Sequence, residues 1–168
     1  MNLPKLIITD IDGVWTDGGM YYDQNGNELK KFNTSDSAGI LFCKGFNIPV
    51  AIITGEDTEI VKRRAKKLKI EYLFQGVSDK LKIATELIKK IEIDFCDIAF
   101  IGDDIGDLSL LKKTGISCAP NNSSEYIKKH VNFVTTKNGG DGAFREFIEY
   151  ILGEKRILEF LDNFEIKS

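Results

Sequence analysis

The amino-acid sequence predicts an α/β fold in which a doubly wound parallel sheet carries a β-hairpin cap as an insertion. Short apolar runs rich in Ile and Val alternate with longer stretches of helical periodicity, the pattern of strand–helix–strand units that build a parallel sheet. Residues 20–32 break this alternation, because two segments of alternating polarity flank Asn25-Gly26, a strong hairpin signal. The hairpin follows the first strand directly, so we expect it to lie over the strand ends.

Six short apolar runs are the predicted strands of the sheet. In chain order they are residues 5–9, 50–54, 72–74, 98–102, 115–119 and 132–135. Four stretches of helical periodicity, several of which open on Asp as a favoured capping residue, are the predicted helices. They are residues 36–47, 57–68, 79–91 and 104–114. Open parallel sheets bind ligands beyond the carboxyl ends of their strands, so functional residues are expected there.

The length of the chain predicts one compact domain. It has 168 residues, of which 42% are hydrophobic, enough for a real core and too few for two ordinary domains. We expect this domain at residues 1–153, with the hairpin insertion at about 19–33 and a C-terminal tail at 154–168. The N-terminus lacks the features of a signal peptide, and no run approaches the ~20 apolar residues that span a bilayer. A cytoplasmic protein is therefore expected.

The composition argues against several classes of partner. A net charge of −3 does not suit broad affinity for nucleic acid or for anionic membranes, so an anionic substrate would have to be captured by a local cluster of groups. The three cysteines are an odd number and widely spaced, which fits neither a disulfide framework nor a zinc site. We expect Cys43, Cys96 and Cys118 to be buried as small hydrophobic residues.

The first predicted strand ends in the sequence DIDGVWTDGG, which brings two acids close together. Asp10 closes the apolar run and Asp12 lies two positions further on, so a turn after the strand can aim both carboxyl groups at one place outside the sheet. Such a pair can divide the work of phosphoester cleavage, one acid attacking phosphorus and the other moving protons. Taken alone, the motif is equally consistent with a turn rich in Asp and Gly.

Three further strand ends favour the chemical interpretation. The second strand closes on Thr54-Gly55, a hydroxyl and an unhindered amide that can hold a phosphate oxygen, and Lys80 opens the helix after the third strand. The fourth strand ends in a cluster of acids, whose mutual repulsion calls for a hard cation with oxygen ligands, Mg²⁺. Chance rarely assembles these groups in this order. The acids of the cluster are Asp103, Asp104 and Asp107.

These motifs resemble those of the haloacid dehalogenase (HAD) superfamily of phosphatases. DIDG, ITG, DK and GDDxxD match its four motifs across residues 6–107. The resemblance implies a HAD-like phosphatase with a Rossmann-like sheet, in which Asp10 is the nucleophile and Asp12 the general acid/base. It also implies that Thr54, Gly55 and Lys80 bind the phosphate.

The same resemblance implies a metal cofactor. Mg²⁺ would be bound by Asp10, the Asp12 carbonyl and Asp103, with Asp104 and Asp107 supporting the metal or the lysine. The cation would offset the negative charge that otherwise repels the attack on phosphorus.

Two other classes of protein share some of these features. Phospho-receiver domains also combine an acid cluster, a hydroxyl residue and a lysine on a doubly wound sheet, but their acceptor Asp follows a middle strand of the chain. Here the pair follows the first strand, and Asp12 supplies the acid/base that a receiver lacks, which favours turnover. A non-catalytic interaction domain is disfavoured because no position of the four motifs is missing.

Two longer segments resemble a small-capped, tetrameric group within the superfamily. They are TDGGMYYDQNGNELKKFNTSDSAGI at residues 16–40 and NGGDGAFREF at residues 138–147. In that group the hairpin is the whole cap, which leaves the site open. The resemblance implies a homotetramer that packs hairpin to hairpin, with each pocket completed by a neighbouring subunit. A hairpin whose edges would otherwise be unpaired is consistent with such packing.

The substrate implied is a small sugar-acid phosphate of the ulosonate type. Members that act on 3-deoxy-manno-octulosonate 8-phosphate usually have Arg at two places where this chain has Ser35 and Glu56. Arg64 matches that group, whereas Glu56 with Lys67 resembles the branch that acts on 2-keto-3-deoxynononate 9-phosphate, a sialic acid relative. We expect the nine-carbon substrate, with the eight-carbon compound as the alternative. The residues expected to bind the sugar are Thr34, Glu56, Arg64 and Lys67.

Overall fold

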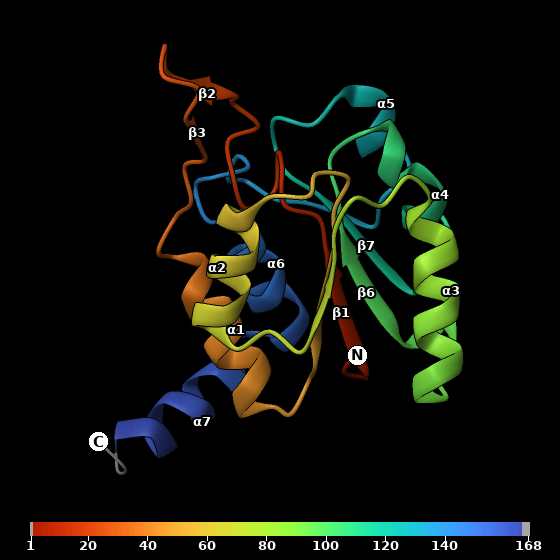
Figure 1. The fold of residues 1–168 in the computed structure, drawn as a ribbon. Helices are drawn as coiled ribbons and strands as arrows, with labels where there is room; N and C mark the ends of the chain where they lie inside the picture. The colour runs from red at the N-terminus through yellow and green to blue at the C-terminus, as the bar shows by residue number, and fades with distance from the viewer. Residues whose placement is uncertain (1, 166–168) are drawn as a thin grey trace.

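The computed structural model describes residues 2–165 and has a six-stranded parallel sheet at its centre (Figure 1). The strands follow the order β5-β4-β1-β6-β7-β8, and every neighbouring pair is parallel. The predicted doubly wound sheet is therefore confirmed. The strands are β1 Leu6–Thr9, β4 Val50–Ile53, β5 Tyr72–Phe74, β6 Ile98–Ile101, β7 Ile116–Ala119 and β8 Phe133–Val134.

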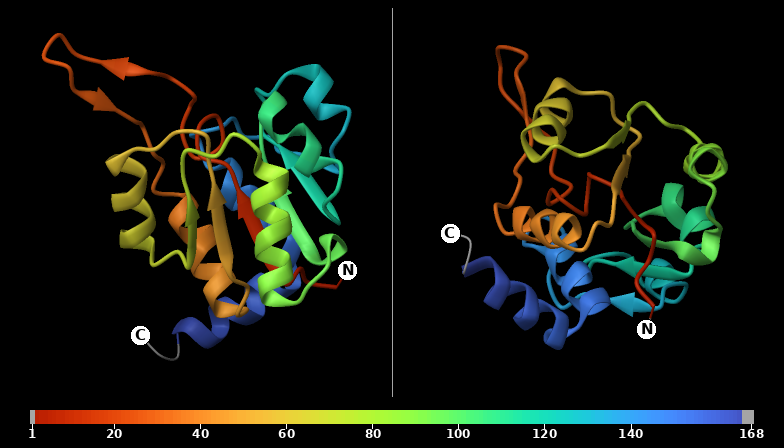
Figure 2. Two further views of the ribbon diagram at one scale, coloured as in Figure 1. Left: turned by 45° about the vertical axis from the view of Figure 1, so that its right-hand side comes forward. Right: turned by 90° about the horizontal axis from the view of Figure 1, so that it is seen from below.

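Helices cover both faces of the sheet, so the central strands are apolar on both sides (Figures 1 and 2). In β1, Ile7 packs on one face, and Leu6 and Ile8 pack on the other. The first face carries α1 Asp36–Gly45, α2 Glu59–Leu68 and α6 Ala143–Leu152, with α7 Glu154–Glu165 outside them. The second face carries α3 Lys80–Ile91, α4 Leu108–Leu111 and α5 Glu125–Lys128. The chain also has two short 3-10 turns, η1 Phe95–Asp97 and η2 Ile105–Asp107.

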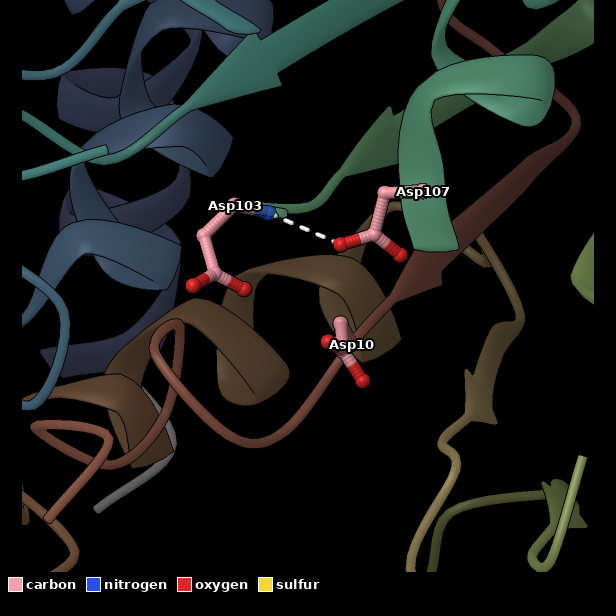
Figure 3. Close-up of side chains that lie close together, drawn as sticks. All are labelled: Asp10, Asp103 and Asp107. Carbon is pink, nitrogen blue, oxygen red and sulfur yellow. Dashed lines mark hydrogen bonds between the residues drawn. The ribbon is translucent and has the colours of Figure 1, made fainter. Parts of the chain in front are cut away.

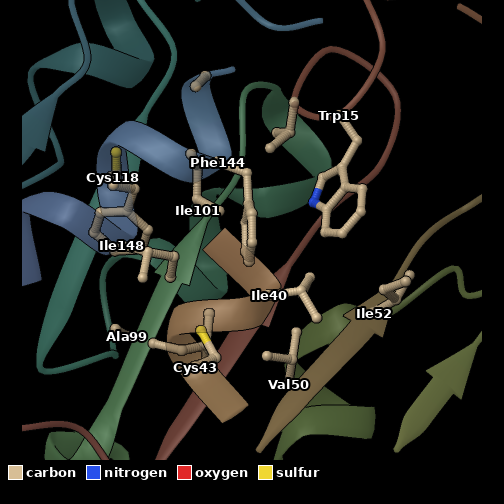
Figure 4. Close-up of a cluster of buried hydrophobic side chains, with 14 of the residues drawn as sticks. Trp15, Ile40, Cys43, Val50, Ile52, Ala99, Ile101, Cys118, Phe144 and Ile148 are labelled. Atoms are coloured by element: carbon tan, nitrogen blue, oxygen red, sulfur yellow. The ribbon is translucent and has the colours of Figure 1, made fainter. Parts of the chain in front are cut away.

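The two longer sequence motifs meet where α1 packs against α6. Gly39 of α1 lies against the ring of Phe144, since a Cβ at Gly39 would come within 3.0 Å of that ring. Phe144 in turn packs on Trp15, with ring centroids 4.7 Å apart (Figure 4). The buried Asp36 accepts a hydrogen bond of 3.1 Å from the backbone N–H of Arg145, and burial raises the pKa of this carboxyl to about 6. Asp36 therefore caps a helix other than its own.

The predicted hairpin is present and extends away from the sheet (Figure 2). Its strands, β2 Tyr21–Tyr22 and β3 Glu28–Leu29, are joined by a turn in which Asp23 accepts backbone hydrogen bonds from Asn25 and Asn27. At its base, Thr16 and Phe32 form an antiparallel bridge. Four large apolar side chains of the hairpin are exposed, namely Met20, Tyr21, Tyr22 and Leu29.

Several details differ from the sequence expectation. Asp79 caps α3 as expected, but α2 is capped by Thr58, whose hydroxyl accepts from Val61, and not by Asp57. The predicted helix at 104–114 is divided into η2 and the shorter α4. Cys43 and Cys118 are buried, whereas Cys96 is exposed, because it lies in the short turn η1, which has no buried residue.

The C-terminal part holds two helices, α6 and α7, that were not predicted. The rings of Phe42 and Phe46 lie 5.5 Å and 5.9 Å from that of Phe160, so α7 packs on α1 of its own chain. The boundary between a domain at 1–153 and a tail at 154–168 stays a prediction, and residues 166–168 lie outside the described part. Within residues 2–165, no helix combines the length and apolarity that crossing a membrane requires.

Candidate active site

A pocket of about 380 Å³ lies beyond the carboxyl ends of β1, β4 and β6. β1 is at the centre of the sheet, with β4 on one side and β6 on the other, so this is the place where the chain reverses its winding and where such folds bind ligands. Nine of the twelve predicted site residues line it. They are Asp10, Asp12, Thr54, Gly55, Glu56, Lys80, Asp103, Asp104 and Asp107.

Lys80 links two acids at the floor of the pocket. It is the first residue of α3, and its ammonium donates to Oδ1 of Asp107 at 2.6 Å. The same Nζ lies 2.9 Å from Oδ1 of Asp10, outside the directions of a hydrogen bond, so this contact is an ion pair. Asp10 and Lys80 are each only 7% exposed. Burial alone would lower the pKa of Lys80, but Asp10 and Asp107 outweigh it and raise that pKa, so the lysine stays charged.

Asp107 is fully engaged by its neighbours. Its Oδ2 accepts a hydrogen bond of 2.9 Å from the backbone N–H of Asp103 (Figure 3). The same oxygen accepts a second one of 3.2 Å from the backbone N–H of Asp104, and Oδ1 accepts from Lys80. The bend after β6 is thereby fixed, and Asp103 is aimed at Asp10. Gly102 permits this geometry, since a Cβ there would come within 2.5 Å of the Asp107 carboxyl carbon. Asp107 thus positions its neighbours.

The acids of the pocket lack compensating charge. Burial, and then the charge of Asp107, raises the pKa of Asp10 to about 7 against the opposing effect of Lys80. Burial, followed by Asp10 and Asp107, raises the pKa of Asp103 to about 8. The single ammonium of Lys80 is therefore not enough to keep both of these carboxylates ionised at neutral pH.

The same acids fit a divalent cation. Carboxylate oxygens of Asp10, Asp103 and Asp107 lie within 4.8 Å of one another. Oδ1 of Asp10 and Oδ1 of Asp103 are buried and accept no hydrogen bond from the described residues. Hard carboxylate oxygens with free lone pairs are the ligands that Mg²⁺ prefers. Because both oxygens of Asp107 are already used, Asp10 and Asp103 are the side chains available to a metal.

The turn after β1 brings Asp12 to the pocket wall and leaves room for Asp103. The backbone N–H groups of Val14, Trp15 and Thr16 all point to the carbonyl of Ile11, which makes a tight turn. Gly13 in this turn has φ +83°, and a Cβ at that position would overlap the Asp103 carboxylate. Only glycine both adopts this positive φ readily and leaves space for the Asp103 carboxylate.

Asp12 is held by a lysine of the hairpin that sequence reasoning missed. Lys30 donates to Oδ1 of Asp12 at 2.7 Å and to Oδ2 at 2.8 Å, and the Thr16 hydroxyl donates to Oδ1 at 3.2 Å. Lys30 follows Asp12 by 18 residues and reaches it only because the hairpin turns back. No local spacing rule could find this pair.

The second strand end forms the lip of the pocket. Thr54 is buried, and its backbone N–H donates to the Phe74 carbonyl, so the hydroxyl-bearing residue is fixed against β5. Gly55 and Glu56 follow on the surface of the molecule and line the opening. Ser78, also in the lining, lies on the neighbouring loop before Lys80 and was not predicted.

Three predicted sugar-binding residues do not line the pocket of the single chain. Thr34 and Lys67 are exposed. Arg64 is half-buried beside the hairpin stem, where its Nη2 donates to the Asn33 carbonyl and to the Ser37 hydroxyl, both at 3.1 Å. A role for these residues in substrate binding stays a prediction.

Comparison with known proteins agrees with the fold. The model of the haloacid dehalogenase-like hydrolase family matches residues 57–147. The chain is also 38% identical to a curated relative over 148 residues, which are 88% of this chain and 82% of the relative. The chain therefore belongs to the haloacid dehalogenase-like hydrolases.

The names of the relatives are more specific than the name of the family. The one just described is 3-deoxy-D-manno-octulosonate 8-phosphate phosphatase KdsC of Haemophilus influenzae. A crystal structure of the phosphatase of that name from Moraxella catarrhalis, in complex with magnesium, phosphate and KDO, has a TM-score of 0.90 and 37% identity, covering 98% of this chain and 94% of that one. A probable YrbI family phosphatase from Pseudomonas syringae has a TM-score of 0.92 and 39% identity, with the same coverage of 98% and 94%.

These relatives bear on the expected substrate. Their names specify the eight-carbon ulosonate phosphate, which is the alternative substrate expected from the sequence. The nine-carbon substrate is not confirmed by them, so the alternative is the better supported of the two.

Proposed function

We propose that this chain is a Mg²⁺-dependent phosphatase that hydrolyses the terminal phosphoester of a ulosonic acid phosphate. The observation that carries the proposal is the buried group around Asp10, in which Lys80 pairs with the carboxylate and Asp103 leaves an oxygen free beside it. The hydrolase family and the names of the relatives support the same reaction.

Two acids share the chemistry. The Asp10 carboxylate attacks phosphorus, so a bond from its oxygen to phosphorus forms while the ester bond to the sugar oxygen breaks. Asp12 gives a proton to the departing alkoxide and then takes one from the water that attacks the aspartyl-phosphate. This second step restores the Asp10 carboxylate and releases phosphate. Thr54, Gly55 and Lys80 bind the phosphate oxygens at the pocket wall.

Asp10, Asp103 and the backbone carbonyl of Asp12 would hold Mg²⁺. When bound, the ion offsets the negative charges of the nucleophile and of the phosphoryl group. In its presence both acids are kept ionised, which their raised pKa values would otherwise oppose at neutral pH.

The first candidate substrate is 3-deoxy-D-manno-octulosonate 8-phosphate, because the curated relatives carry that activity in their names. A second candidate, 2-keto-3-deoxynononate 9-phosphate, is kept because a specific residue favours it. Glu56 lines the pocket where the eight-carbon group usually has Arg, and a carboxylate accepts hydrogen bonds from sugar hydroxyls where a guanidinium cannot.

The substrate proposal is tested by measuring kcat/KM for both ulosonate phosphates and for p-nitrophenyl phosphate with the purified protein and Mg²⁺. We expect both sugar-acid phosphates to exceed the aryl phosphate, with the eight-carbon compound preferred. A preference of tenfold or more for the nine-carbon compound would select the second candidate. A higher kcat/KM for the aryl phosphate than for either ulosonate would contradict the proposed substrate class.

We also propose that four subunits pack hairpin to hairpin and that a neighbour completes each pocket. The exposed apolar side chains of the hairpin support this, because such groups rarely cluster on a free surface. The predicted sugar-binding residues outside the pocket of one chain are consistent with it as well. The cytoplasm remains the location that the sequence favours.

The assembly is tested at the hairpin tip. Tyr22 and Leu29 are 66% and 62% exposed, so a Tyr22→Ser, Leu29→Ser variant should fold normally but sediment as smaller species than the wild-type tetramer. It should lose most activity on the ulosonate phosphate and keep most on p-nitrophenyl phosphate. Leu158→Ser, which changes a 53% exposed side chain of α7, is the matched control and should remain tetrameric. A fully active wild-type monomer would refute the assembly.

A further inference from the structure

The hairpin contributes a side chain to the chemistry as well as a surface. Lys30 contacts both oxygens of Asp12, at 2.7 Å and 2.8 Å, so its ammonium lies between them, close to the line of the Cβ–Cγ bond, and fixes the direction in which the carboxylate points. Rotation about that bond changes neither distance, and the hydrogen bond of 3.2 Å from the Thr16 hydroxyl to Oδ1 alone limits the rotation. The lysine of the hairpin and Thr16 together determine the orientation of Asp12.

Lys30 cannot serve the substrate directly in this arrangement. Its side chain is only 1% exposed and it does not line the pocket, whereas the Asp12 side chain is 28% exposed and does. Anything in the pocket therefore meets Asp12 and not the lysine behind it. The lysine acts on the pocket only through the carboxylate that it holds.

The lysine is itself held firmly. The bridge between Thr16 and Phe32 lies two residues beyond Lys30 and ties the returning hairpin strand to the turn that carries Asp12. Thr16 adds its own hydrogen bond of 3.2 Å to Oδ1 of Asp12. Asp12 is thus held by one hydrogen bond from its own turn and by the lysine of the hairpin.

The two acids of the first motif consequently have separate lysines. Asp10 pairs with Lys80 of α3, and Asp12 pairs with Lys30 of the hairpin. A buried ion pair contributes little net stability in comparison with apolar packing, because both charges lose solvent. Burying a lysine against a carboxylate of the pocket is therefore better explained by function than by folding.

We propose that Lys30 is a positioning residue that holds the Asp12 carboxylate in the orientation for proton transfer to the leaving group and from water. This inference rests on the proposed function, since it assigns Lys30 to the acid/base of that reaction. The hairpin is then part of the proton-transfer machinery of its own chain, in addition to any contact that it makes with a neighbour.

The proposal predicts an effect that depends on the leaving group. Phenolate needs a proton as it leaves far more than p-nitrophenolate does, although phenyl and p-nitrophenyl phosphate are similar in size. Lys30→Met should lower kcat/KM by about 10- to 100-fold for phenyl phosphate, part of the ~10²–10⁴-fold that general acid/base catalysis supplies. For p-nitrophenyl phosphate, kcat/KM should change by less than about threefold, because its leaving step needs little acid.

The second half-reaction gives an independent readout. Asp12 also acts as base toward water, so Lys30→Met should slow hydrolysis of the aspartyl-phosphate for every substrate. With p-nitrophenyl phosphate, kcat should fall while kcat/KM holds, and rapid mixing should reveal a burst of p-nitrophenol close to one per site. A merely structural change would lower the active fraction and produce neither the split nor the burst.

Matched variants separate the possible outcomes. Lys31→Met removes the adjacent lysine, which makes only long ion pairs of 3.7 Å and 3.8 Å with Asp17 and Asp141, and should behave as wild type. Lys30→Arg keeps two donors and should recover part of the loss. In an Asp12→Asn background, Lys30→Met should have no further effect on phenyl phosphate, since the group that it positions is gone.

Equal losses on the two aryl phosphates without a burst, or wild-type kinetics in Lys30→Met, would overturn the proposal. Circular dichroism and thermal unfolding show whether each variant is folded. If Lys30→Met does not fold, the same kinetic comparison is made with Lys30→Arg. Failure of the proposed function looks different, because the wild-type chain would then hydrolyse neither aryl phosphate with Mg²⁺, or Asp12→Asn would leave phenyl phosphate turnover intact.

Discussion

The carboxyl edge of the sheet and the hairpin differ in how far a single chain completes them. At the edge, Asp10, Lys80 and Asp107 are buried and hold one another at 2.6 Å and 2.9 Å. In the hairpin, Tyr22 and Leu29 present most of their surface to solvent. One chain therefore completes the groups that are proposed to act at phosphorus, whereas the surface of its hairpin is still open.

Chemistry at phosphorus and recognition of the sugar can therefore be separated by experiment. Changes at the edge should affect every phosphate ester, because all of them share the steps at phosphorus. Changes at the lip or at the hairpin tip should affect the sugar-acid phosphate alone. Lys30 is the exception, since it belongs to the hairpin in sequence and to the edge by its contact with Asp12.

The largest effect is expected at Asp10, the proposed nucleophile. Asp10→Asn keeps the shape of the side chain but removes its nucleophilic oxygen, so kcat should fall by roughly 10³-fold or more on sugar-acid and aryl phosphates alike. Folding should be retained, because the side chain lies at a strand end. Steady-state assays and circular dichroism are the measurements. A variant that retains a tenth of the wild-type kcat would contradict the assignment of Asp10 as the nucleophile.

A somewhat smaller loss is expected for Asp12→Asn. Its amide can neither give a proton to the alkoxide nor take one from water, so kcat should fall by ~10²–10⁴-fold on the sugar-acid phosphate. The fall in kcat/KM should be smaller on p-nitrophenyl phosphate, whose leaving group needs little help. Losses of the same size in kcat/KM on both substrates would show that the Asp12 side chain does not act as the acid for the leaving group, and wild-type kinetics would show that Asp12 acts only through its backbone carbonyl.

For Glu56 at the lip of the pocket, the predicted loss of activity is confined to the sugar-acid phosphate. Glu56→Ala should lower kcat/KM for the preferred ulosonate phosphate by roughly ten- to a few-hundredfold, since hydrogen bonds to a charged group contribute ~1.5–3 kcal/mol. Activity on p-nitrophenyl phosphate should barely change. Asp57→Ala removes the adjacent acid, which pairs with Lys62 outside the pocket, and serves as the control. Equal losses on both substrates would assign Glu56 to the phosphate or metal site.

The smallest effect concerns stability against pH. The folded, metal-free chain keeps protons on Asp10 and Asp103, with pKa values of about 7 and 8, that the unfolded chain releases near 3.8. The folded state therefore binds more protons between these limits, and its stability should fall as the pH rises from about 4 to about 8. Thermal unfolding with EDTA should show a Tm that declines over this range.

Addition of Mg²⁺ sharpens that test. The cation competes with protons for the two carboxylates, so it should raise the Tm more at pH 8 than at pH 6. Asp103→Asn should flatten the pH dependence and weaken the response to Mg²⁺. An equal rise in Tm at both pH values would show that Mg²⁺ does not bind through these acids.

The sheet and the pocket floor could be predicted because their signals are local. Apolar runs and the residues that end them placed Asp10, Thr54, Lys80 and Asp103 at one edge, and the parallel sheet brought them together. Helix boundaries were harder to predict, as the capping of α2 by Thr58 in place of Asp57 illustrates. Two acceptable capping residues stood side by side, and only the packing decides between them.

What could not be predicted depends on contacts between distant segments. The pair of Lys30 and Asp12 requires the path of the hairpin, and the capping of α6 by Asp36 joins residues 109 positions apart. Neither contact leaves a periodic trace in the sequence. The sugar-binding roles of Thr34, Arg64 and Lys67 depend on surfaces outside the pocket of one chain, which no pattern within a single sequence describes.

The central claim, that phosphoryl transfer passes through Asp10, is tested most directly by trapping the covalent intermediate. Asp12→Asn, in which hydrolysis of the aspartyl-phosphate is slow, is mixed with p-nitrophenyl phosphate and Mg²⁺, quenched in acid, digested, and analysed by tandem mass spectrometry. We predict one phosphoryl group on the peptide that begins after Lys5, located at Asp10 and absent when Asp10 is also changed to Asn. A phosphoryl group on any other residue, or p-nitrophenol release with no phosphorylated peptide, would contradict the account.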